Sequence, residues 1–185
     1  DWVYAGPYME EGKNNQDIFD TAFPPEQGDA TVDWKPLPRE AVIAERLSRL
    51  PEDWQSMLAA ASVEGEEFTA EAVARVQRED ERQVVQRLSG PLSQQHHLVH
   101  AQGIQWLDGQ RLSHYRFRHF LFQKYLYNKL DAVQRAHLHQ EMGNTLETLH
   151  GEQVGELAVS LARHFEAAGM TVKAVEYLLQ AGNRS

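Results

Sequence analysis

The chain has 185 residues, enough for one large domain or two small ones, and its 42% apolar and 24% charged residues are ordinary for a globular protein. Cysteine is absent, which excludes disulfides, thiol catalysis, iron–sulfur clusters and cysteine-based zinc sites. No apolar run reaches about 18 residues, and no secretory signal pattern opens the sequence. We therefore expect a cytoplasmic protein without a transmembrane helix.

The net charge of −9 is spread unevenly. Residues 1–36 carry a net charge of −6, residues 37–130 are neutral, and residues 131–185 carry −3. Phosphate contacts supply most of the affinity of proteins for nucleic acid, so this balance disfavours general DNA binding. Charge and patterning together predict three segments with these bounds.

Residues 1–36 show no helical or strand period, and four prolines and three glycines interrupt them. Yet this segment contains six aromatic residues, a number that disordered linkers seldom carry. These are Trp2, Tyr4, Tyr8, Phe19, Phe23 and Trp34. Two interpretations stay open: an arm that docks on this chain or on a neighbour, and a loose leader with a few local contacts.

Helical patterns dominate the first half of the next segment. Apolar residues recur three and four positions apart, and Pro51, Gly65 and the Gly90-Pro91 pair interrupt them. Thr69 and Asp80 stand where N-caps are expected. The expected helices cover residues 38–50, 52–62, 70–76 and 81–95.

Strand signals follow. Two short apolar runs, Leu98–Ala101 and Ile104–Leu107, precede the tight-turn pair Asp108-Gly109. Leu112–His119 then alternates, which directs Tyr115 and Phe117 to one face. Helices in a helix-turn-helix order followed by a β-hairpin are the outline of a winged helix, which we expect over residues 37–130.

From Phe120 onward the sequence is helical throughout. We expect one buried face after the hairpin, formed by Phe120, Leu121, Tyr125, Leu126 and Leu130. Three further helices are expected over residues 132–149, 154–168 and 172–181, ended by Gly151, Gly169 and Gly182. Short loops favour antiparallel pairing. The predicted fold is therefore mainly α, with a small β-hairpin wing and antiparallel helical pairs.

Three stretches, in this order, carry a resemblance to a known family: LPREAVIAERLSRLPEDWQSMLAAASVEGEEFTAEAVARV, YRFRHFLFQKYLYNKL and LARHFEAAGMTVKAVEYLLQAG. They resemble the region that follows the nucleotide-binding core in bacterial STAND-type signalling ATPases. These AAA/NACHT-like proteins are often fused to adenylate or guanylate cyclases or to transcriptional activators. The resemblance covers residues 37–185 and implies a winged helix followed by a tetratricopeptide-like array.

The last stretch fits one tetratricopeptide unit at its packing positions. Phe165 matches the aromatic of the first helix, Gly169 the turn, and Ala174 and Ala181 the small positions of the second helix. Ala158 departs from the pattern, where a Trp is usual. One repeat cannot bury its own face, so we expect a fragment of a longer array. An ordinary helical hairpin is the alternative.

His119 stands at the junction of the alternating strand and the following helix. The resemblance implies a role for this position: in related NACHT and NB-ARC switches, a histidine at this place in the winged helix senses ADP and is the centre of a Met-His-Asp motif. This chain has Arg118-His119-Phe120, so the Asp is replaced. A histidine at a helix N-terminus can donate to a phosphate, and a core histidine bonded to a carbonyl is the alternative.

The sequence predicts neither catalysis nor a metal site in this chain. The segment Gly6–Asn14 fails as a phosphate loop, because five residues separate its glycines and Asn14 replaces the hydroxyl residue. The pairs His96/His100 and His137/His139 have no third ligand, so we expect surface or helix-end histidines. No cofactor is expected here, whereas ATP or ADP is expected in a nucleotide-binding domain that these residues lack.

We therefore expect a non-catalytic regulatory region. The resemblance implies that the winged helix packs on the nucleotide-binding domain of the same protein, while the helical repeats bind a protein or small-molecule effector. The alternative is a DNA-binding transcriptional regulator. Its candidate contacts are Arg82 and Arg87 on the expected recognition helix and Arg111, Arg116 and Arg118 on the wing.

Overall fold

The structure is a computed structural model that describes residues 39–107 and 109–183. The expected aromatic arm and the Gly6–Asn14 segment lie outside the described residues. Within the described ranges, no helix is long and apolar enough to cross a membrane. The fold is mainly helical with a small three-stranded antiparallel sheet, as the sequence predicts at this level.

Four helices and a short π-helical turn form the first part. They are α2 (Arg39–Ser48), α3 (Glu52–Glu64), α4 (Ala70–Gln77), α5 (Glu81–Ser89) and the turn η1 (Pro91–Gln95). Asp80 caps α5 as expected, because its side chain accepts the N–H of Gln83 at 3.1 Å. The Gly90-Pro91 pair was expected to bend or end the helix over residues 81–95, and α5 does end at Ser89, because Pro91 has no backbone N–H to continue the helix.

The sheet contains β1 (Glu67–Thr69), β2 (Val99–Leu107) and β3 (Gln110–Phe117) in the order β1-β3-β2. Phe68 lies opposite Tyr115, and Val99 lies opposite Phe117. The two strands expected on either side of Gly103 form one strand, because a bulge at this point absorbs the irregular stretch. The short strand β1 was not predicted.

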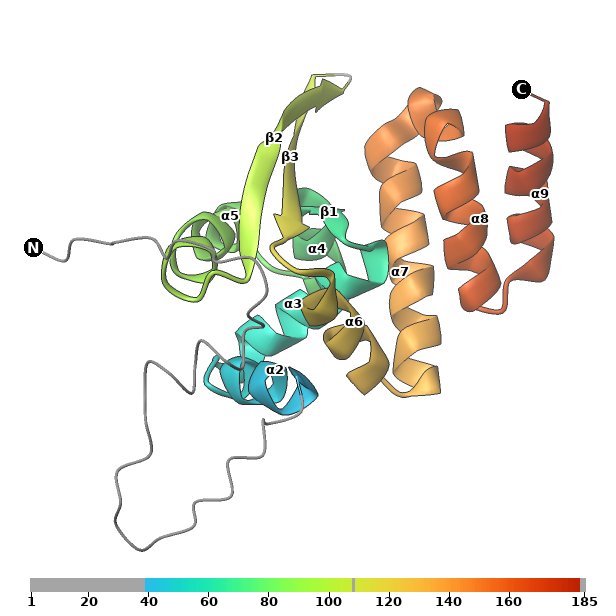
Figure 1. Cartoon of the computed structure of the whole chain (residues 1–185). Coiled ribbons are helices and arrows are strands. Elements are labelled where there is room, and N and C mark those ends of the chain that lie inside the picture. The colour runs from blue at the N-terminus through green and yellow to red at the C-terminus, as the bar shows by residue number, and fades with distance from the viewer. Residues whose placement is uncertain (1–38, 108, 184–185) are drawn as a thin grey trace, which may run out of the picture. The chain divides into compact units, whose positions relative to one another are not determined.

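The C-terminal part is α6 (Phe120–Lys129), α7 (Ala132–His150), the 3₁₀ turn η2 (Gly151–Leu157), α8 (Ala158–Ala167) and α9 (Thr171–Gly182). Asp131 and Gln134 form a capping box that starts α7. The helix expected from Val154 begins only at Ala158, since the preceding residues form the 3₁₀ turn. Figure 1 shows α7, α8 and α9 standing beside one another, with successive helices running in opposite directions.

Two buried clusters hold these elements together. The first lies among α2–α6 and one face of the sheet, where Phe68 packs against Tyr115 and Phe117 with ring centroids 6.1 and 5.1 Å away. Phe122 and Leu126 bring α6 into it. Phe120 was expected to be buried and is 52% exposed, because α6 turns its Phe122 face inward instead.

The second cluster joins the hairpin to the C-terminal helices. Leu107 and Leu112 come from β2 and β3, Val63 and Ala72 from α3 and α4, and six further residues complete it: Met142, Leu146, Leu149, Leu161, Phe165 and Ala174. The side chains of α7 and α8 therefore share one core with the sheet-bearing part.

Candidate functional site

His119 lies on the surface at the start of α6. Its Nδ1 accepts the backbone N–H of Leu121 at 3.2 Å, so the imidazole caps the helix. Its ring stacks on Phe120, with centroids 5.1 Å apart. The side chain is exposed, so the alternative of a core histidine is wrong. Capping occupies Nδ1, and Nε2 is the ring nitrogen left for a ligand.

Arg118 precedes this cap and is tied to β2. Its backbone N–H donates to Leu98 O at 2.9 Å, and its Nε donates to Val99 O at 3.3 Å. Among residues 39–107 and 109–183, the two terminal guanidinium nitrogens of Arg118 have no hydrogen-bond or ion-pair partner. Arg118 and His119 are thus neighbours on an exposed corner between the sheet and α6.

Two of the arginines proposed for DNA contact are engaged in ion pairs within the fold. Arg87 bridges Glu79, with which it makes a short hydrogen bond, and Asp53 at 3.4 Å. Arg116 pairs with Glu66 at 2.7 Å and with Glu67 at 3.7 Å, which raises the pKa of its guanidinium. Each pair neutralises a cation that a phosphate would need.

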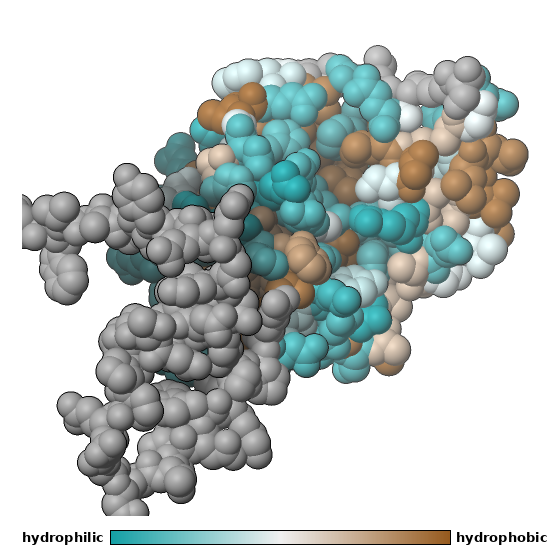
Figure 2. Space-filling view, viewed as in Figure 1, coloured by the Kyte–Doolittle hydropathy of each residue, from teal (hydrophilic) through white to brown (hydrophobic). Residues whose placement is uncertain are grey.

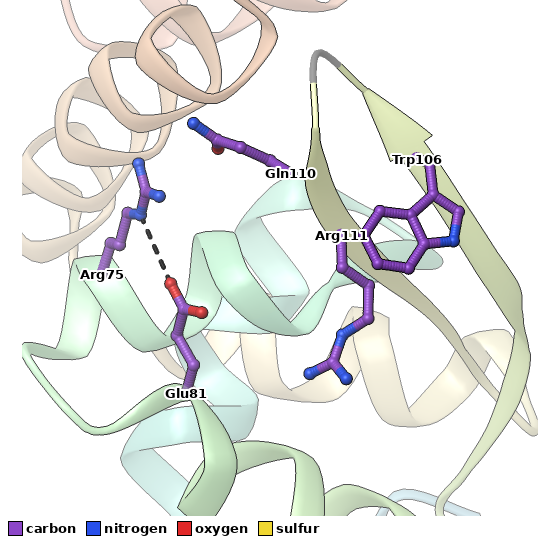
Figure 3. A pocket seen from close by; sticks show the side chains of 5 residues that line it. All are labelled: Arg75, Glu81, Trp106, Gln110 and Arg111. Carbon is purple, nitrogen blue, oxygen red and sulfur yellow. Dashed lines mark ion pairs between the residues drawn. The ribbon is translucent and has the colours of Figure 1, made fainter.

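The remaining candidates, Arg82 and Arg111, are exposed and make no ion pair within residues 39–107 and 109–183. Arg111 lies opposite Trp106 across the hairpin. Arg111 and Trp106 line an open cleft of about 300 Å³ between the hairpin and the α4–α5 junction, together with Gln110 and the ion pair Arg75–Glu81, whereas Arg82 does not line it. Figure 3 shows that ion pair facing the hairpin, with Arg111 beside Trp106. The 70% exposure of Trp106 is unusual for an indole.

The residues expected to pack a helical repeat lie at the α8–α9 hairpin. Phe165 is fully buried and stacks on Tyr177, with centroids 5.7 Å apart. Gly169 forms the turn with a φ of 78°, a region that favours glycine. Ala174 is buried against this core, whereas Ala181 is half-buried.

A buried hydrogen-bonded chain of side chains links α6, α7 and α8. The Tyr127 hydroxyl lies 2.9 Å from Nε2 of His139, and Nδ1 of His139 lies 2.9 Å from Nδ1 of His164. Nε2 of His164 is buried without a hydrogen-bond partner among the described residues. His139 was expected at the surface; it is buried because its face of α7 packs on α8.

Burial gives these imidazoles strongly lowered pKa values. Desolvation, with smaller effects of Arg163 and Arg135, lowers the pKa of His139 to about 4. Desolvation, His139 and Arg163 lower that of His164 to about 3. Both rings are therefore neutral at physiological pH. Nothing in the sequence pattern signals this pairing, because the two histidines are 25 positions apart.

Two acidic residues lie where α3 meets α4. Glu64 accepts the backbone N–H of Thr69 at 3.0 Å and its hydroxyl at 2.8 Å. Burial outweighs these bonds and raises the pKa of Glu64 to about 7. Glu71 is buried and accepts the N–H of Ser113 at 2.7 Å, which fixes α4 to β3. In the part of the chain that the structure describes, no group of three or more His, Asp or Glu could hold a metal ion.

The outer side of α9 is apolar and exposed. Figure 2 shows hydrophobic side chains gathered over this helix at the right of the view. The patch consists of Val172, Val175, Leu178 and Leu179. Their spacing places them on neighbouring positions of the helix surface that faces away from α8.

Comparison with known proteins identifies no relative: no family model, no curated protein and no solved structure matches this chain.

Proposed function

We propose that this chain is a non-catalytic regulatory region in which a winged helix, residues 37–130, transmits the state of a helical hairpin to a nucleotide-binding domain. The observation that carries the proposal is the order and pairing of the elements. A helix, a short strand, two helices and a hairpin follow one another, with sheet order β1-β3-β2. This is the arrangement expected of a winged helix, and it supports the resemblance to STAND-type ATPases.

The second buried cluster supports the transmitting role. Phe165 of α8 and Leu146 of α7 share it with Leu112 of β3 and Val63 of α3. Close-packed interiors resist gradual deformation. A displacement of α8 therefore either shifts the β2–β3 hairpin or breaks the packing between α8 and this hairpin. In this proposal α8 and α9 begin the helical array, and the apolar side of α9 faces the effector or the next helices.

Charge supports contact with a protein rather than with DNA. Arg87 and Arg116 are neutralised within the fold, and Glu79, Asp80 and Glu81 surround the start of the candidate recognition helix α5. A DNA reader needs the opposite distribution along this helix. For the alternative of a transcriptional regulator, the arginines still available for DNA contact are Arg82, Arg111 and Arg118, and the Nε of Arg118 is already bonded to Val99 O.

His119 and Arg118 are the residues that would reach the nucleotide. The exposed imidazole keeps Nε2 for a phosphate oxygen, and Arg118 adds a cation beside it. The phosphate would belong to ADP bound by the nucleotide-binding domain of the same protein.

The experiment uses the polypeptide that carries both this region and a nucleotide-binding domain. His119→Asn keeps a cap acceptor and removes the imidazole, whereas His119→Ala removes both. We expect each variant to release ADP faster by about tenfold, the effect of one lost charge-assisted hydrogen bond. His137→Asn, at an exposed position of α7, is the matched control. Unchanged ADP retention in both His119 variants would refute the sensor.

A further inference from the structure

The β2–β3 hairpin carries large apolar side chains that the fold does not use. Leu107 and Leu112 point into the second buried cluster. Ile104 and Trp106 lie two positions apart on β2, hence on one face, and are 62% and 70% exposed. Exposed apolar side chains that lie together on a rigid element are typical of interaction surfaces.

The hairpin holds these side chains in place before any partner arrives. Ladder pairing runs from Val99–Phe117 to Leu107–Gln110, with one bulge. The Glu71 carboxylate accepts the N–H of Ser113 at 2.7 Å. A surface that is already ordered loses little conformational entropy on binding, which favours affinity.

A free cation lies beside the indole. Arg111 is the cross-strand neighbour of Trp106, and in the described part of the chain its guanidinium makes no ion pair or hydrogen bond. Across the cleft, Arg75 is held by Glu81 at 3.7 Å, so that pair is neutral as a unit. A guanidinium binds a carboxylate through two parallel hydrogen bonds, and tryptophan and arginine are the side chains most enriched at interface hot spots.

We propose that this surface, formed by Ile104, Trp106 and Arg111, docks a protein segment that presents a carboxylate beside an apolar side chain. The carboxylate pairs with Arg111, and the apolar side chain covers Trp106 and Ile104. The cleft accommodates one negative charge, because Arg111 is its single uncompensated cation among the lining residues.

The same charges oppose a nucleic acid here. Glu81 lines the cleft, and Glu79 and Asp80 precede it in the sequence. The whole chain carries a net charge of −9. A row of phosphates would meet these carboxylates, whereas a single side-chain carboxylate need contact only Arg111.

The test needs this chain alone, so its outcome is independent of the nucleotide experiment above. A displayed library of random peptides is selected on the immobilised chain, and the affinity of the most enriched peptide is measured by calorimetry. We expect peptides with Asp or Glu close to Leu, Phe or Trp. Trp106→Ala and Arg111→Glu should each weaken binding at least about tenfold, the range of hot-spot losses.

Arg82→Glu is the matched control, because it makes the same charge change at an exposed arginine that does not line the cleft. It should leave the affinity within about twofold. Circular dichroism establishes that each variant is folded. Exchange of the peptide's acid for Lys should restore binding to Arg111→Glu. Failure to enrich acidic peptides, equal binding by Trp106→Ala, or Arg111-dependent binding of a labelled duplex DNA instead would each overturn the proposal.

Discussion

Nδ1 of His139 lies 2.9 Å from Nδ1 of His164, so two neutral imidazoles share one hydrogen between α7 and α8. Tyr127 extends this chain to α6. Arg163 and Arg135 lie near enough to disfavour an additional proton. The contact between these helices is therefore sensitive to acid.

The histidine pair should make the protein less stable as the pH falls below neutral. An unfolded histidine titrates near 6.5, whereas the folded pair titrates near 4 and 3, so between these values the unfolded state binds more protons. Each histidine should thus lower the free energy of unfolding by about 1.4 kcal/mol per pH unit over this interval. Urea unfolding at several pH values measures the slope.

The double variant His139→Leu/His164→Leu should lose this part of the slope. His137→Gln, on the exposed side of α7, should keep the slope of the native chain. An unaltered pH dependence in the double variant would contradict the assignment to the buried pair.

Glu64 should act in the opposite direction. Its folded pKa of about 7 exceeds the ordinary value of 4.5, so the folded state holds an extra proton between them. The stability that this proton contributes is complete below 4.5 and is lost as the pH rises through 7. Relative to the native chain, Glu64→Gln should therefore have a higher free energy of unfolding at pH 8 than at pH 5. The difference between the two pH values should be up to roughly 2–3 kcal/mol. Equal effects at both pH values would disagree with a protonated Glu64.

Gly143 should tolerate no side chain. A Cβ at this position of α7 would lie 2.9 Å from the buried ring of Phe165. Gly143→Ala gains about 1 kcal/mol of helix propensity, but overpacking costs about 1–3 kcal/mol, so we expect a net loss in thermal unfolding. Gly182→Ala is the control, since a Cβ there meets nothing. A stabilised Gly143→Ala would show that α7 and α8 can move apart at no cost.

The His119 cap can be separated from any role in nucleotide sensing. His119→Ala removes the acceptor of the Leu121 N–H and should cost about 0.5–1 kcal/mol of stability. His119→Asn supplies another acceptor and should cost much less. Chemical denaturation of the isolated chain measures both. Equal losses for the two substitutions would mean that the imidazole stabilises α6 through its stacking on Phe120 instead.

Periodicity and capping residues predict most of the helices and the hairpin. The Asp80 cap, the break at Gly90-Pro91 and the alternation at Tyr115 and Phe117 are local signals, and the structure follows them. Strand β1 has three residues, too few for a period, and it is defined by pairing with a strand about 50 positions away.

The chemistry of the surface depended on the tertiary structure. From sequence alone, an arginine on a predicted helix is expected to be a free cation. In the structure, however, Arg87 forms ion pairs with Asp53 and Glu79 from other parts of the chain. Likewise, His139 and His164 become a pair only when α7 and α8 pack. Arg111 was a candidate contact from the sequence. That Trp106 lies beside it is known only from the register of the hairpin.

The central claim is that this chain contacts proteins rather than nucleic acid. The most direct measurement is fluorescence anisotropy of a labelled random duplex DNA titrated with the chain at low salt. The account predicts no binding up to tens of micromolar, because Arg87 and Arg116 are neutralised within the fold and the whole chain carries a net charge of −9. Binding that weakens steeply with added salt, and is lost in the triple variant Arg82→Ala/Arg111→Ala/Arg118→Ala, would contradict it.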